Sequence, residues 1–105
     1  MYRGTTPTIT INVKGETFDN STIFVTLAQD SVEITKTGED VVKTVVGENS
    51  TLSIYLTQEE TLSLTKGNAR IQIRWINSDG SAFASPIKVI GVDTILLEGV
   101  IEHAS

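Results

Sequence analysis

The residues that could do acid–base chemistry in this sequence begin with the adjacent pair Glu59 and Glu60. Two carboxyl groups can serve as acid and base on a glycosidic or phosphodiester bond, here with Asp79 or Asp93 in support. Adjacent residues on a helix do not face each other, however, and no third polar group has a spacing that would place it beside them. We therefore expect the pair to lie in a solvated first turn of a short helix.

Metal and nucleophile chemistry is limited by what the sequence lacks. It has no cysteine, which excludes a thiolate zinc site, a disulfide and a cysteine nucleophile. Its one histidine is His103, so a His-based metal centre or a Ser-His-Asp triad is not expected. Asp40, Asp79 and Asp93 are too dispersed for a calcium-binding loop. We expect no catalytic residue, no cofactor and no metal.

Arg70, Gln72 and Arg74 alternate along one expected strand and would share one face of a sheet. A basic stripe beside an aromatic residue can bind single-stranded nucleic acid or an anionic glycan. Alternation places Trp75 on the opposite face, however, and the chain carries 8 basic against 13 acidic residues, for a net charge of −5. We expect an ordinary exposed sheet face, Trp75 in the core, and no nucleic-acid partner.

Two triplets match the acceptor pattern for N-glycosylation, namely Asn20-Ser21-Thr22 and Asn49-Ser50-Thr51. Asn and Ser also favour the turns that lead into strands, and this is the role we expect for both triplets.

The elements that position these residues are expected to be strands. Thr, Ile and Val number 15, 12 and 10, so 37 of the 105 residues are β-branched and suited to a pleated sheet. A chain of this length suits one domain with its own core. No apolar run approaches the roughly 20 residues of a membrane span, and the first residues hold no hydrophobic signal core. We expect a soluble protein with no signal peptide and no membrane partner.

Short alternating runs recur between turn residues, a pattern that predicts an all-β, Ig-like antiparallel β-sandwich of about seven to nine strands. The main runs are 7–13, 22–29, 32–36, 41–46, 51–56, 70–77 and 87–92. Thr57 to Glu60 fits a capping box and predicts one short helical turn. Asp79-Gly80 predicts a two-residue type I′ hairpin that sets Trp75 near Ala84.

The two ends of the chain differ from its middle. Residues 1–6 would form an N-terminal arm, either disordered or gripping a neighbouring subunit, before a sandwich domain at 7–93. Residues 94–105 would hold an apolar strand and a short tail. The run 94–101 is apolar on both faces apart from Glu98 and Gly99, so it is either buried centrally or meets a partner chain. The candidate interface residues are Ile95, Leu96, Leu97, Val100 and Ile101.

The second half of the sequence resembles a known group of proteins. The features are a strand that ends in a Thr-x-Glu-Glu turn, a Gly-containing turn before a long strand, and an Asp-Gly hairpin. They are carried by LSIYLTQEET at 52–61, KGNARIQIRW at 66–75 and DGSAFAS at 79–85. This order is similar to small phage and prophage proteins of Gram-positive bacteria and, more loosely, to the N-terminal β-sandwich domain of siphophage baseplate upper proteins. The resemblance covers 50–93 best and implies a structural role in tail or baseplate assembly, without catalysis.

We therefore expect a non-enzymatic, phage-encoded structural or assembly protein that contacts other phage proteins or further copies of itself. The 94–101 segment would add a strand to a neighbour. The protein would be found in the virion or, during assembly, in the cytoplasm of the bacterial host. The alternative is a carbohydrate-binding or cell-surface-binding β-sandwich module, with Phe18 and Phe83 as its loop aromatics.

Overall fold

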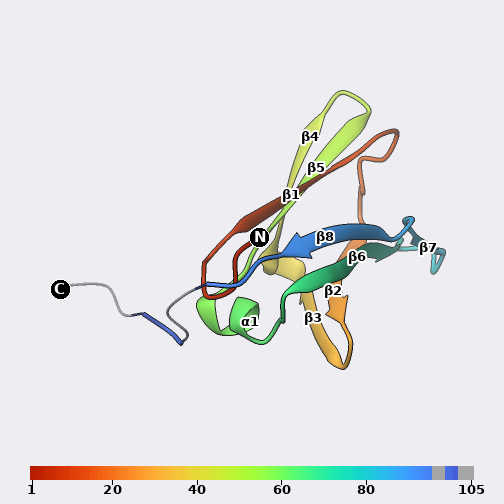
Figure 1. Cartoon of the computed structure of the whole chain (residues 1–105). Coiled ribbons are helices and arrows are strands. Elements are labelled where there is room, and N and C mark those ends of the chain that lie inside the picture. Colours follow the sequence, from red (N-terminus) through yellow and green to blue (C-terminus); the bar gives the residue numbers. More distant parts are fainter. Residues whose placement is uncertain (96–98, 102–105) are drawn as a thin grey trace.

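The computed structural model describes residues 1–95 and 99–101 (Figure 1). Within them the chain forms two antiparallel sheets, one α-helical turn and one 3₁₀ turn, η1 (Gly38–Asp40). The first sheet has the order β1-β5-β4, built from β1 (Thr8–Val13), β5 (Asn49–Tyr55) and β4 (Val41–Val46). The second has the order β3-β2-β6, with β7 and β8 both beyond β6. Its strands are β2 (Thr22–Gln29), β3 (Val32–Thr37), β6 (Gly67–Ile76), β7 (Ala82–Ala84) and β8 (Lys88–Val92).

The chain visits the two sheets in the order of an immunoglobulin-type sandwich. It starts in the first sheet with β1, crosses to β2 and β3, returns to β4 and β5, and crosses again to β6, β7 and β8. In the usual letters, β1-β5-β4 correspond to strands B-E-D, and β3-β2-β6-β8 to C′-C-F-G. The expected Ig-like antiparallel β-sandwich with one short helical turn is confirmed.

The core lies between the sheets and is made by alternate residues of the strands. Along β2, for example, Ile23, Val25 and Leu27 are buried while Thr22 and Phe24 are exposed. Burying one such apolar side chain contributes about 1.5–3 kcal/mol. A shift of register by one residue would turn that whole set outward, so the alternation fixes the inner face of each strand. The apolar side chains with almost no exposure are Phe18, Val25, Leu27, Leu52, Ile54, Leu56, Leu64 and Ala69.

The helical turn α1 (Gln58–Leu62) begins at the predicted capping box. The backbone N–H of Glu60 donates to Thr57 Oγ1 (3.1 Å), and the N–H of Thr57 donates to Glu60 Oε1 (2.9 Å). Removing such a cap costs about 1 kcal/mol. Further along, the buried Thr61 hydroxyl donates to the carbonyl of Thr5 (2.8 Å), which ties the helix to the start of the chain. The prediction of a capped helical turn between two strands is confirmed.

The hairpin between β6 and β7 differs from the prediction by one residue. Gly80 N–H donates to Asn77 O (3.0 Å) and Asn77 N–H donates to Ser81 O (2.9 Å), so the loop has three residues, 78–80. A type I′ turn needs positive φ at both central residues, but in this fully described loop only Gly80 has one, at 90°. The pairing is therefore shifted, and Trp75 lies opposite Phe83 rather than Ala84.

β7 and β8 are two parts of one interrupted strand beside β6. β7 pairs with residues 74–76 and β8 with residues 67–71. Between them, Ser85 N–H donates to Ile73 O (2.8 Å) and Ser85 Oγ accepts from Ile73 N–H (3.0 Å), so a side chain continues the ladder. Pro86 follows and has no N–H to donate, which ends the regular pairing until β8 begins. Pro86 thus stands two residues before β8, which begins at Lys88.

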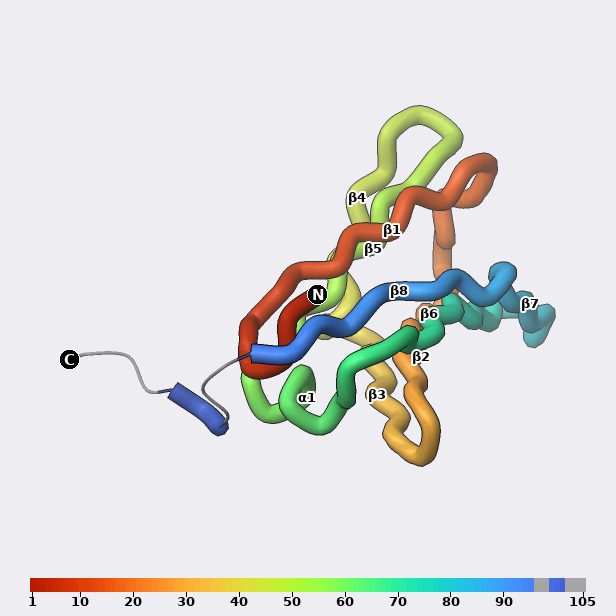
Figure 2. Tube along the Cα trace, in the orientation of Figure 1, coloured from red at the N-terminus to blue at the C-terminus, as the bar shows by residue number. Residues whose placement is uncertain are grey.

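The start of the chain lies along the end of β8, as the trace in Figure 2 shows. Tyr2 forms a parallel bridge with Asp93. Arg3 N–H donates to Asp93 O (3.0 Å), and Asp93 N–H donates to Met1 O (2.7 Å). Residues 1–3, part of the segment that the sequence sets apart as an arm, thus pair with the residue that follows β8 in the same chain.

Candidate functional site

The two adjacent carboxyl groups have different surroundings. Glu59 is exposed, whereas Glu60 caps α1 and forms an ion pair with Lys36 of β3, with 2.7 Å between Nζ and Oε2. Partial burial raises the pKa of Glu60, but hydrogen bonds from Lys36 and Thr57, together with the charge of Lys36, outweigh it and hold the pKa below its usual value. Glu60 is therefore kept ionised as a structural link between β3 and α1.

The described residues show neither a cluster of metal ligands nor a helix that could span a membrane. Residues 1–95 and 99–101 contain no group of three or more His, Cys, Asp or Glu side chains that could hold a metal ion. In the same residues, no helix has the length and apolar character needed to cross a bilayer. His103 lies outside the described residues.

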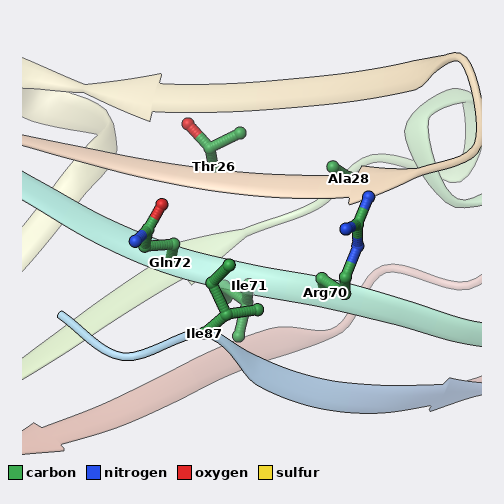
Figure 3. A pocket seen from close by; sticks show the side chains of 6 residues that line it. All are labelled: Thr26, Ala28, Arg70, Ile71, Gln72 and Ile87. Atoms are coloured by element: carbon green, nitrogen blue, oxygen red, sulfur yellow. The ribbon is translucent and has the colours of Figure 1, made fainter. Parts of the chain in front are cut away.

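A shallow hollow of about 190 Å³ lies on the outer face of the second sheet (Figure 3). Its lining residues are Thr26, Ala28, Arg70, Ile71, Gln72 and Ile87. Arg70 and Arg74 are exposed and Trp75 belongs to the opposite face, as predicted, while Gln72 Nε2 donates to Ser85 O (2.9 Å). An exposed ion pair contributes about 0–1 kcal/mol, so the Arg70 guanidinium offers only weak contact to an anion in this hollow.

The aromatic residues considered for glycan binding are packed on Trp75. Phe18 is 1% exposed and meets the Trp75 ring edge to face, with 5.1 Å between the ring centroids. Phe83 stacks on the same ring at 5.6 Å and is about half exposed. The buried Nε1 of Trp75 has no hydrogen-bond partner among the described residues. Phe18 is therefore a core residue and is not available to contact a sugar.

The two Asn-Ser-Thr triplets stand where the chain enters strands, as expected: the first leads into β2 and the second begins β5. Asn20 has a positive φ of 56° just before β2. Asn49 begins β5, and its Oδ1 accepts from the N–H of Gly15 (2.9 Å). The left-handed backbone at Asn20 and the side-chain contact of Asn49 thus account for the two asparagines at these positions.

The predicted interface residues of the 94–101 segment are only partly described. Leu96 and Leu97 lie outside the described residues, and Ile95, Val100 and Ile101 lie outside the strands. Ile95 is half-buried against Gly4, where an added Cβ would be 2.8 Å from Ile95 Cδ1. Val100 and Ile101 are exposed.

The backbone of Ile101 is held at both of its polar groups by Gln58 of α1. Gln58 Nε2 donates to Ile101 O (2.8 Å), and Ile101 N–H donates to Gln58 Oε1 (2.7 Å). The two bonds place the apolar side chain of Ile101 beside the helical turn, where it remains open to solvent.

An exposed apolar strand, β4, lies at one end of the first sheet. Val42, Val45 and Val46 are 59%, 44% and 68% exposed, although they point to both faces of the strand. In the described part of the chain β4 pairs only with β5, so its other edge is open. We call the residues 41–46 and this open side the β4 edge. The sequence signal was a run of five β-branched residues interrupted by one lysine, and sequence reasoning did not identify it as a surface.

No protein-family model, no curated protein and no solved structure matches this chain. The strand order defines an immunoglobulin-type β-sandwich. Because one fold can carry many functions, the function must be argued from the surfaces described above.

Proposed function

We propose that this chain is a non-enzymatic structural or assembly protein that acts through protein–protein contacts. The observation that carries the proposal is the β4 edge, where three exposed valines accompany a row of unpaired backbone groups. An open strand edge is a template for a strand of another chain, and natural proteins usually cover or charge such edges. Addition of a strand gives affinity through backbone hydrogen bonds and specificity through alternate side chains.

A second contact surface supports the same function. Val100 and Ile101 are 49% and 61% exposed beside α1, and Gln58 fixes the backbone of Ile101 there. Neighbouring exposed apolar side chains favour burial against another protein. This surface contains two of the five residues that the sequence predicted for an interface.

The assembly we propose is a phage tail or baseplate. The support is the resemblance of residues 50–93 to small phage and prophage proteins. The partners are then other phage structural proteins or further copies of the chain, in the virion or, during assembly, in the host cytoplasm. A net charge of −5 disfavours a nucleic acid as the partner.

Mass spectrometry of purified particles from the phage that encodes the chain tests this proposal. We expect the chain to be present at a fixed ratio to the known tail proteins, and deletion of its gene to leave incomplete tails and few plaques. Complete, infectious particles formed without the chain would contradict the proposal.

A further inference from the structure

The two sheets have four edges in the described part of the chain: β1, β3, β4, and the interrupted pair β7 and β8. The β7–β8 edge carries exposed Phe83, Ile87 and Val89, but it is broken between Ala84 and Lys88, and Tyr2 bridges to Asp93 at its end, so it offers no continuous open strand. β1 presents Thr8, Thr10 and Asn12 outward. β3 carries Glu33 and Lys36, and Lys36 is tied to α1 through Glu60. β4 has five β-branched residues out of six and no acidic side chain. Charged or polar edges resist pairing, so β4 is the edge that favours another strand.

The one charged side chain of β4, that of Lys43, does not hinder the pairing of another strand with its open edge. Lys43 belongs to the inner face, opposite Leu52 of β5, and its Nζ donates to the carbonyls of Thr17 and Phe18, at 3.1 Å each. The ammonium group is therefore bound to the backbone between β1 and β2. It does not lie beyond the strand, where it would repel an incoming chain.

From these observations we infer that the partner of the β4 edge is the β4 edge of a second copy, in an antiparallel, two-fold symmetric pair. In antiparallel pairing about an axis perpendicular to the sheet, residues that share a face stay on that face. With Thr44 on the axis, Val42 of each copy lies opposite Val46 of the other, and Lys43 lies opposite Val45. Val42 and Val46, the two most exposed valines of β4, then pair with each other, Val45 packs beside the stem of Lys43, and the two lysines do not meet.

Two other registers with the same two-fold symmetry would give less favourable side-chain pairs. An axis at Lys43 would put two ammonium groups directly opposite each other, which is destabilising. An axis at Val45 would leave Val42 without a partner from the second β4, which ends at Val46. The Thr44 register would join two three-stranded sheets into one continuous sheet and would close both β4 edges. Because it names a partner for that edge, this inference rests on the proposed protein-contact function.

Multi-angle light scattering of the purified full chain over a concentration series tests the inference, with two variants at the axis. Thr44→Glu and Thr44→Lys each place like charges opposite each other, so each alone should be a monomer. Mixed in equal amounts, they should form a dimer, because the glutamate of one copy then faces the lysine of the other. Thr8→Glu introduces the same charge on the outer face of β1 and is the matched control, which should dimerise like the wild type.

The outcomes separate this inference from the proposed function. A wild-type dimer, two monomeric variants and a dimer in their mixture support the Thr44 register. A wild-type chain that is a monomer throughout overturns the pairing, and so do Thr44 variants that dimerise as well as the wild type. Circular dichroism of each variant shows whether it is folded, and a misfolded Thr44→Glu chain is replaced by Thr44→Asp. Presence of the chain in phage particles is a separate result, so either proposal can fail alone.

Discussion

Lys36 and Glu60 form an ion pair that joins the edge strand β3 to the first turn of α1, with Nζ 2.8 Å from Oε1 and 2.7 Å from Oε2. Oε1 also accepts from the N–H of Thr57, so one carboxylate serves both the helix cap and the ion pair. The N-terminal end of a helix favours a negative charge, which adds to both interactions.

This link predicts that stability falls in acid. The pKa of Glu60 is lower in the folded chain than its usual value, so its contribution is present above the ordinary glutamate pKa of about 4.3 and is lost as the pH falls through the folded value. Denaturant unfolding of the wild type and Glu60→Gln should therefore give a difference in free energy that shrinks as the pH is lowered from 7 to 3.

The control for this prediction is Glu59→Gln, which removes the same charge from the exposed neighbour without breaking the contacts to Lys36 and Thr57. A difference between the wild type and Glu60→Gln that is the same at neutral and acid pH would show that the ion pair does not contribute in this way.

Two glycines should respond in opposite directions to alanine. Gly47 lies in the two-residue turn between β4 and β5 with φ at 63°, whereas Gly91 in β8 does not have a positive φ. Neither would bring a Cβ within 4 Å of a neighbouring atom, so the backbone alone decides. Gly47→Ala should cost about 1–2 kcal/mol, because a left-handed conformation is unfavourable for alanine. Gly91→Ala should be neutral or stabilise by about 0.4–1 kcal/mol.

Thermal and urea unfolding of both alanine variants measure these changes. Equal losses at the two positions would mean that the turn at Gly47 does not require a left-handed residue.

Phe18 should be among the most costly positions to truncate. It is 1% exposed and packs edge to face on Trp75, and loss of a buried phenylalanine side chain typically costs about 3–5 kcal/mol. Phe18→Leu should cost less, since it keeps most of the apolar volume. Both variants keep the same positive φ of 55°, so the comparison isolates packing from backbone strain.

The fluorescence of Trp75, the one tryptophan in the chain, reports this unfolding directly. A Phe18→Ala variant as stable as the wild type would place the Phe18 side chain outside the core.

The parts of the fold that could be predicted are those set by nearby residues. Alternation in the Arg70 strand correctly separated Trp75 from the two arginines, and the Thr57 to Glu60 pattern correctly predicted a capped turn. The Asp79-Gly80 pair was less decisive, because two-residue and three-residue hairpins both use a glycine with positive φ. The choice between them moved the whole β7 register by one residue.

The burial of Phe18 and the exposure of β4 could not be read from nearby residues. Phe18 stands in a polar loop sequence, and it is buried because β6 brings Trp75 against it from 57 positions away. The run at 41–46 would suit a central strand equally well. It is an open edge because β5 is the central strand of the first sheet, which leaves β4 on the outside with a single neighbour.

Hydrogen–deuterium exchange of the full chain across a dilution series tests the central claim, that this sandwich works through its β4 edge. We predict that a peptide covering 41–46 exchanges slowly at high concentration and faster on dilution, as its outward N–H groups lose their partner strand. A peptide covering β1 should not change. Exchange in 41–46 that stays the same at every concentration would contradict the account.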